Sequence, residues 1–194
     1  MARRPHPRAG LFGALVLAAA ILVAACVAVE RRSGPDAAPP DVPAAVQTPP
    51  RPPDAIAMTM EYAYDGDTIR ARPVDRATLL GSTDAVRVRI IGIDAPEGTP
   101  TLECGADAAR DHLARLLPEG ARVWAAVEAE PQDRYGRRLL HLWTDDGRFV
   151  AGELVAAGQA AALRVPPNVT HAALLSALEA DAETAGRGQW SACR

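Results

Sequence analysis

The sequence contains no lysine, so all 21 of its basic residues are arginines. The part of the chain from residue 54 onward holds 15 of these arginines against 21 acidic residues, a formal charge of −6 with histidine neutral. This balance excludes a nucleic-acid binder that works through bulk positive charge. Any attraction to a phosphate must therefore come from a local cluster of arginines or from a metal ion.

The chain also lacks internal repeats, and aromatic residues make up only 4% of it. Both features argue against a structural or adhesive surface domain. The four histidines, at positions 6, 112, 141 and 171, show no spacing typical of metal ligands. A zinc site built on histidine therefore has no support in the sequence.

The first 29 residues have the pattern of an export signal. Arg3, Arg4 and Arg8 precede an uncharged and almost wholly apolar run over 11–29. This run is long enough to span a bilayer, so an uncleaved membrane anchor is an alternative. Val23-Ala24-Ala25-Cys26 resembles a bacterial lipobox, in which Cys26 would be lipidated. Lipoprotein, anchor and plain secretion stay open, and each of them places the rest of the chain outside the cytoplasm.

Residues 30–53 contain eight prolines and are predicted to form a semi-rigid, extended tether. Residues 54–194 then remain for one domain of about 140 residues, which is close to the usual domain size. The chain is thus divided into a leader (1–29), a linker (30–53) and a domain (54–194). We expect a monomer and infer no protein partner.

From residue 54 onward the pattern predicts an α+β fold. Strands over 57–64 and 68–74 would form a hairpin around Asp65-Gly66-Asp67, because an Asp-Gly pair between extended runs is a turn signal. A loop over 76–84 follows, and further strands are predicted over 85–93, 122–129 and 138–143. Helices are predicted over 105–117, 149–157 and 170–185, the last with Thr170 or Asn168 as N-cap. Five strands and three helices in this order predict a small β-barrel with appended helices.

The stretch from Val86 to Glu97 contains an arginine in an apolar strand that runs into two carboxylates. Apolar residues occur at both odd and even positions of this run, which predicts a strand buried on both faces. Burying an unpaired charge costs on the order of several kcal/mol. Arg89 therefore needs an anionic partner, either from the protein or from a ligand such as phosphate.

Four segments occur in an order that resembles the staphylococcal nuclease (thermonuclease-like) family. They are Asp65-Gly66-Asp67-Thr68, the stretch from Arg89 to Glu97, Asp133-Arg134-Tyr135-Gly136-Arg137, and the tail from Asn168 to Trp190. The resemblance covers residues 57–190, essentially the whole predicted domain. It implies a five-stranded OB-type β-barrel with three α-helices.

The resemblance also implies a Ca²⁺-dependent nuclease that hydrolyses phosphodiester bonds in DNA and RNA and leaves 3′-phosphate ends. Arg89 and Arg137 would bind the scissile phosphate, and Glu97 would act as general base on the attacking water. Arg134 and Tyr135 are weaker candidates for substrate contact. The residue types suit this chemistry, since planar guanidinium groups donate paired hydrogen bonds where negative charge develops.

The metal ligands implied by the resemblance are Asp67, Asp94 and the backbone carbonyl of Ala95. A donor set made only of oxygen suits a hard cation such as Ca²⁺. A carboxylate at position 97, three residues beyond a ligand, can reach a water that the metal orients. The implied base and the implied metal ligands therefore belong to one stretch of chain.

Each of these residues also has an ordinary structural interpretation. Asp67 could be only a turn residue, and Asp94 and Glu97 could form a capping and loop pair. Arg89 could be paired only with those two carboxylates, and Arg137 could be a surface arginine beside Asp133. For the whole protein, the alternative to an enzyme is a non-catalytic module of the same fold that binds nucleic acid or protein.

The chain departs from the family in the segment 158–167, where the best-known members carry two tyrosines that contact the nucleotide. No aromatic residue occurs there in this chain. Stacking is worth about 1–3 kcal/mol per base, so its loss lowers the expected substrate affinity. Arg164 could replace part of this contact.

Only two cysteines, Cys104 and Cys193, lie in the predicted domain. Export would permit a disulfide between them, which would pin the last helix to the barrel. Two free thiols are the alternative.

Overall fold

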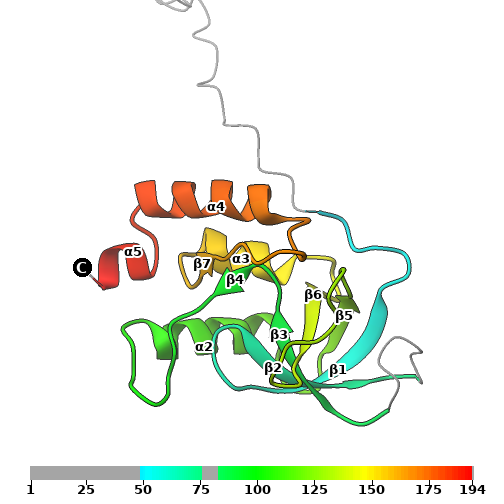
Figure 1. Ribbon diagram of the computed structural model, residues 1–194. Coiled ribbons are helices and arrows are strands. Elements are labelled where there is room, and N and C mark those ends of the chain that lie inside the picture. Colours follow the sequence, from blue (N-terminus) through cyan, green and yellow to red (C-terminus); the bar gives the residue numbers. More distant parts are fainter. Residues whose placement is uncertain (1–48, 76–82, 194) are drawn as a thin grey trace, which may run out of the picture. The chain divides into compact units, whose positions relative to one another are not determined.

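Five strands close into a barrel in the order β1-β2-β3-β6-β5 (Figure 1). They are β1 (Ile56–Ala63), β2 (Thr68–Pro73), β3 (Val86–Ile90), β5 (Arg122–Ala126) and β6 (Arg138–Thr144). β3 and β6 run parallel, and every other neighbouring pair is antiparallel. The predicted α+β fold with a five-stranded barrel is therefore confirmed, as is the hairpin of β1 and β2.

The computed structural model describes residues 49–75 and 83–193. These residues belong to one unit, Val46–Arg194. The predicted leader with Cys26, the linker up to residue 48 and residues 76–82 of the predicted loop lie outside the described residues. In the described ranges no helix is both long and apolar enough to cross a membrane.

The described chain begins in contact with the barrel. The indole nitrogen of Trp143 donates a hydrogen bond to the carbonyl of Pro49, at 2.9 Å. The guanidinium of Arg51 lies 4.1 Å from the ring centroid of Trp124, a cation–π contact. The last residues of the proline-rich segment thus lie against β5 and β6.

The apolar run over 85–93 forms two short strands, so the single strand predicted there is wrong. β3 ends at Ile90, and a turn at Gly92 (φ +88°) leads into β4 (Ile93–Asp94), which pairs with β7 (Ala161–Ala162). β3 is also not buried on both faces, because Arg87 is exposed. Of the apolar residues after Ile90, Ile91 lies in the turn and Ile93 belongs to β4, and counting them with β3 concealed its alternation.

Three helices lie where they were predicted. They are α2 (Ala106–Leu116), α3 (Val150–Ala156) and α4 (Ala172–Thr184). α2 buries Ala106, Ala109, Leu113 and Leu116, whose spacing of three and four defines one face of a helix. A short helix, α5 (Gln189–Ala192), was not predicted, because four residues are too few to show a helical period.

The N-cap predicted for α4 is wrong. The helix begins after His171, and no side chain caps it. Asn168 instead exchanges hydrogen bonds with the backbone of Glu130, at 2.9 and 2.8 Å. The hydroxyl of Thr170 donates to the carboxylate of Glu128, at 2.7 Å. Both predicted caps therefore tie the segment before α4 to the segment after β5.

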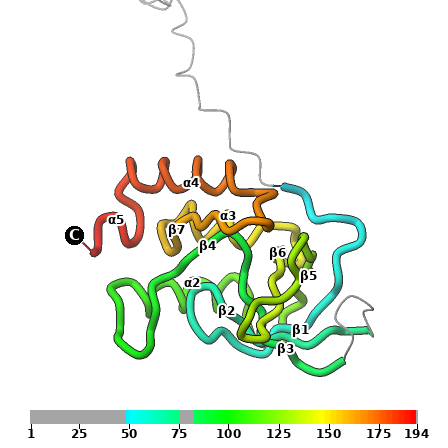
Figure 2. Tube along the Cα trace, in the orientation of Figure 1, coloured from blue at the N-terminus to red at the C-terminus, as the bar shows by residue number. Residues whose placement is uncertain are grey.

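Cys104 and Cys193 form a disulfide. It joins the segment that leads into α2 to the residue that follows α5, across 89 positions of sequence. Figure 2 traces the chain from α4 through α5 to the C-terminal end. The bond therefore fixes the end of the chain to the segment before α2.

Candidate active site

Arg89 projects from the outer face of β3, and hydrogen bonds hold its guanidinium. Nη1 donates to the carbonyl oxygens of Ile90, at 3.0 Å, and Ile93, at 2.7 Å. Nη2 lies 3.0 Å from Oδ2 of Asp67 and 2.9 Å from Oδ1 of Asp94. The two carbonyls are within reach because the chain turns directly after β3. The protein itself thus supplies the anionic partners that Arg89 requires.

Asp67 ends the turn between β1 and β2 and is only 2% exposed. Its Oδ1 accepts from the hydroxyl of Thr68, at 3.0 Å, and its Oδ2 from the N–H of Ala95, at 2.9 Å. Gly66 permits this close approach, because a Cβ there would lie 2.6 Å from the Cβ atoms of Ala95 and Ala109. The turn is therefore packed against α2 and against the segment after β4.

Two carboxyl groups at this site, those of Asp67 and Glu97, have raised pKa values. Burial raises the pKa of the Asp67 carboxyl to about 6, against the lowering effect of Arg89. Partial desolvation raises the pKa of Glu97, although its side chain is largely exposed, and the charges of Asp65 and Asp94 add to the increase. A higher pKa makes the Glu97 carboxylate a better proton acceptor near neutral pH. Further positive charge would stabilise the ionised form of these groups.

Glu97 opens a loop that closes on itself before α2. Its N–H donates to the carboxylate of Glu103, at 3.0 Å, and its carbonyl accepts from the N–H of Glu103, at 2.9 Å. The side chain of Glu97 stays exposed. The backbone is therefore fixed at this position, while the carboxylate remains accessible to water.

Arg137 is held by Asp133 in the loop before β6. The Asp133 carboxylate accepts from the N–H groups of Tyr135 and Arg137, both at 2.9 Å, and from Nε of Arg137, at 2.6 Å. Burial opposes ionisation of Asp133, but these hydrogen bonds hold its pKa below the usual value. Arg137 thus lies beside Asp133, as the ordinary structural interpretation predicted. The same contact also holds its guanidinium in place.

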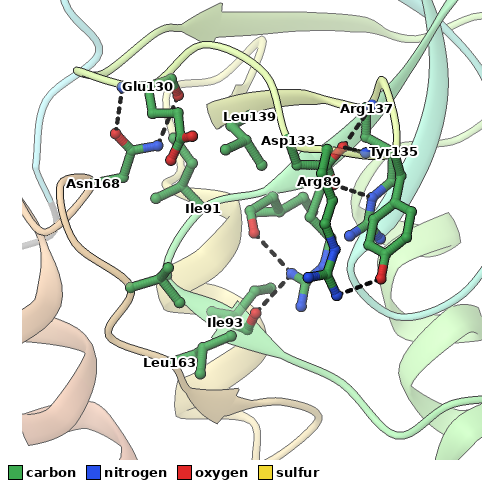
Figure 3. A pocket seen from close by; sticks show the side chains of 14 residues that line it. Arg89, Ile91, Ile93, Glu130, Asp133, Tyr135, Arg137, Leu139, Leu163 and Asn168 are labelled. Atoms are coloured by element: carbon green, nitrogen blue, oxygen red, sulfur yellow. Dashed lines mark hydrogen bonds and ion pairs between the residues drawn. The ribbon is translucent and has the colours of Figure 1, made fainter.

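A cavity of about 490 Å³ brings the two arginines together (Figure 3). Arg89, Arg137, Arg134 and Tyr135 line it, and Arg134 donates a hydrogen bond to the Tyr135 hydroxyl, at 2.6 Å. In Figure 3, Arg89, Tyr135 and Arg137 gather on one side of the cavity. Two guanidinium groups from separate parts of the sequence therefore face one space that can hold an anion.

The implied base and metal ligands lie next to this cavity and do not line it. Asp67 and Asp94 reach it through Arg89, which bonds both carboxylates and also lines the cavity. Glu97 is close enough to Arg89 for the guanidinium to lower its pKa. Arg89 is thus the residue that connects the acidic groups with the anion-binding space.

The rest of the lining was not predicted from the sequence. Apolar side chains, among them Ile91, Leu139 and Leu163, form much of the wall. Glu130 and Asn168, which bond each other, lie on the side opposite Tyr135 in Figure 3. These residues come from segments distant in sequence, so only the tertiary structure brings them to one wall.

Comparisons with known proteins show which family this sequence resembles. Residues 87–192, more than half of the chain, match the family model described as staphylococcal nuclease homologue. A thermonuclease of Staphylococcus intermedius is 31% identical over 125 residues, which cover 61% of this chain and 73% of the relative. The chain belongs to the staphylococcal nuclease family. Membership supports a nuclease-like function at the level of the family.

This family member differs from the expectation at Arg164. Arg164, considered above as a partial replacement for the missing tyrosines, does not line the cavity. Leu163 and Val165, its neighbours on either side, do. They are 37% and 52% exposed, so this part of the wall offers aliphatic surface where the best-known members of the family offer aromatic rings.

The implied calcium ligands are few. Within 49–75 and 83–193, no three His, Cys, Asp or Glu side chains form a group that could hold a metal ion. The implied set is smaller, since it consists of two carboxylates and the carbonyl of Ala95. Its donors are all oxygen, which suits Ca²⁺. The residues therefore fit a hard cation.

Proposed function

We propose that this chain is a Ca²⁺-dependent nuclease that hydrolyses phosphodiester bonds in DNA and RNA and leaves 3′-phosphate ends. The observation that carries the proposal is the cavity lined by both Arg89 and Arg137, beside which Glu97 has a raised pKa. A phosphodiester is an anion, and attack concentrates further negative charge on its equatorial oxygens. Two guanidinium groups held in advance stabilise that charge where it develops.

In the proposed reaction, Glu97 accepts a proton from the attacking water, whose oxygen forms the new bond to phosphorus. The bond to the 5′-oxygen breaks, and that oxygen takes up a proton from solvent, which leaves the phosphate on the 3′ side. Arg89 and Arg137 donate hydrogen bonds to the phosphoryl oxygens. Because the protein already holds both guanidinium groups, binding requires little further ordering of their side chains.

Asp67, Asp94 and the backbone carbonyl of Ala95 would hold the calcium ion. When bound, the ion supplies positive charge beside the phosphate and orients the water. The oxygen-only donor set supports this assignment.

The proposed location is outside the cytoplasm, with the domain tethered to a membrane or secreted. The apolar run over 11–29, the lipobox at Cys26 and the proline-rich linker support export. The disulfide between Cys104 and Cys193 adds support, because such bonds persist mainly in oxidising compartments.

The test is a cleavage assay of the purified chain on single-stranded DNA, double-stranded DNA and RNA, with Ca²⁺ titrated and with a chelator. We expect cleavage only when Ca²⁺ is present, and products whose 3′ ends a polymerase extends only after phosphatase treatment. A chain that binds these substrates and cuts none of them at any Ca²⁺ concentration would be a non-catalytic module, and the proposal would be wrong.

A further inference from the structure

Two exposed tyrosines and three arginines gather on the outer face of β1, β2 and β3, outside the cavity. We name this surface the strand platform; it consists of Tyr62, Tyr64, Arg70, Arg72 and Arg87. Tyr62 is 46% exposed and Tyr64 is 37% exposed, with ring centroids 4.9 Å apart. The guanidinium of Arg87 lies 4.3 Å from the ring centroid of Tyr64. Large aromatic side chains are thus held at the surface beside positive charge.

The strand register places this platform in line with the proposed active site. Tyr62 pairs with Arg70, and Arg70 pairs with Arg87. Residues directly opposite each other on neighbouring strands project from the same face of a sheet. Arg89 lies two residues beyond Arg87 and therefore projects from that face too, roughly 7 Å further along β3. In Figure 1, β1 and β2 lie along the lower edge of the barrel, away from α4, and β3 rises from that edge toward β4.

A β-bulge in β1 brings Tyr62 to the surface. Met58 and Met60 point into the core, so strict alternation would bury Tyr62 as well. The register instead shifts between Met60 and Tyr62, which makes Glu61 the extra residue and turns Tyr62 outward. Bulges are often found next to active sites, where they re-aim side chains.

The platform is locally positive although the domain is acidic. Glu61 pairs with both Arg70, at 2.8 Å, and Arg72, at 3.0 Å. Arg87 contacts the Tyr64 ring instead, so the platform carries three guanidinium groups and Glu61 pairs with two of them. Arginines beside exposed aromatic rings suit single-stranded nucleic acid, because its phosphates bind the guanidinium groups and its open base faces stack on the rings.

We propose that the strand platform binds the single strand of nucleic acid where it continues beyond the scissile phosphate. This inference rests on the proposed function, since it assigns the scissile phosphate to Arg89. Tyr62 and Tyr64 would stack against bases, and the platform arginines would contact the neighbouring phosphates. Stacking contacts would thus lie on β1 in a chain whose 158–167 segment contains no aromatic residue.

The test measures binding of a fluorescein-labelled single-stranded DNA 16-mer by anisotropy. The protein is the full chain with Glu97→Gln, so that the probe is not cut. We expect the double substitution Tyr62→Ala/Tyr64→Ala to raise the Kd about 5- to 150-fold, the range given by the stacking of one base. The matched control, Tyr62→Phe/Tyr64→Phe, keeps both rings and should bind within about 2-fold of the parent.

A second pair of variants tests the charge. Arg87→Gln should reduce the slope of log K against log salt by about 0.7, the value for one phosphate contact on a single strand. Arg110→Gln, at an exposed arginine of α2, removes the same charge and should leave the slope unchanged. Equal slopes for Arg87→Gln and its parent would contradict the phosphate contact.

Three outcomes overturn the inference. The first is an unchanged Kd for the alanine pair in a chain whose thermal melting matches the parent. The second is a loss of affinity of the alanine pair for a blunt duplex, whose base faces are covered, as large as its loss for the single strand. The third is a Phe pair that binds as weakly as the Ala pair. Failure of the proposed function looks different, because the strand platform would still bind the 16-mer while the chain with Glu97 intact cut nothing.

Discussion

The Asp67 carboxylate and the Arg89 guanidinium lie 3.0 Å apart in a pair whose side chains are 2% and 13% exposed. Burial disfavours the charge of Asp67, and Arg89 offsets part of that cost. A buried ion pair of this kind adds little to stability compared with apolar packing. Removing only one of its partners is costly, because the other charge stays buried without compensation. Arg89 therefore stabilises the fold while it faces the cavity.

Removing Arg89 alone should destabilise the protein strongly. Arg89→Gln would leave a buried carboxylate without its counter-charge, which costs about 3–5 kcal/mol. Adding Asp67→Asn should recover part of this loss, because the remaining group is neutral. The measurement is the free energy of unfolding from urea titrations without Ca²⁺. Purely additive effects of the two substitutions would contradict the coupling, and Arg87→Gln, on the same strand but exposed, serves as the control.

Glu97→Gln should lower kcat by about 10²–10⁴-fold without lowering the free energy of unfolding, because the raised pKa of Glu97 means that its charge costs stability. The amide keeps the shape of the side chain but cannot accept a proton from water. Glu103→Gln, in the same loop, retains an oxygen that can accept the hydrogen bond from the N–H of Glu97 and should stay active. A Glu97→Gln enzyme that cuts at the parent rate would show that another group is the base.

Local sequence signals were sufficient to predict most of the secondary structure. The Asp-Gly turn predicted the hairpin of β1 and β2, and the spacing of Ala109, Leu113 and Leu116 predicted α2. The resemblance carried by four segments in family order then implied that Arg89 and Arg137 would act together. The structure brings both to one cavity, through a turn after β3 and through the carboxylate of Asp133.

What the sequence concealed depends on long-range pairing. The bulge at Glu61 is set by the register between β1 and β2, and without it Tyr62 would point inward. Asn168 was predicted as a helix cap, but it bonds Glu130, which lies 38 positions earlier. Such contacts leave no periodic signal in either segment, because each partner is an isolated polar residue.

Asp94→Asn should weaken calcium binding with little effect on stability. The Asp94 side chain is 60% exposed, whereas that of Asp67 is 2% exposed. We therefore expect Asp94→Asn to raise the Ca²⁺ concentration needed for half-maximal activity, and to leave the urea midpoint nearly unchanged. Asp67→Asn should change both quantities. Identical calcium titrations for Asp94→Asn and its parent would remove Asp94 from the ligand set.

Reduction of the disulfide between Cys104 and Cys193 should lower stability by about 4–5 kcal/mol on the chain-entropy model, because the bond closes a loop of 89 positions. Cys104→Ser/Cys193→Ser should have the same effect. The measurement is thermal melting with and without dithiothreitol. The double variant should show no further response to the reductant, whereas Cys26→Ser should respond as the parent does.

The imidazole of His141 should make the fold sensitive to mild acid. The side chain is 4% exposed, and its Nε2 lies 2.8 Å from Oε2 of Glu128. Its Nδ1 is buried without a hydrogen-bond partner among the described residues. Burial lowers the pKa of His141, although Glu128 acts in the opposite direction. The folded protein therefore favours the neutral ring.

Because the pKa of His141 is lower in the folded state, the free energy of unfolding falls as the pH falls. In the unfolded chain His141 titrates near its ordinary pKa of about 6.5, so as the pH falls through that value the unfolded state takes up the proton first. Stability is then lost below pH 6.5, by about 1.4 kcal/mol for each unit by which the folded pKa lies lower. Burial also lowers the pKa of His171, whose ring lies 4.7 Å from that of His141, so it adds to the loss.

His141→Phe tests this effect, because phenylalanine fits the contacts of the ring with Trp143 and Phe149 and cannot take up a proton. We expect the variant to lose less stability than the parent between pH 7 and pH 5, with the remainder due to His171. The measurement is the urea midpoint at both pH values. An equal drop in variant and parent would show that acid acts elsewhere, for example on Glu128, whose hydrogen bonds from Thr170 and His141 lower its pKa against the effect of burial.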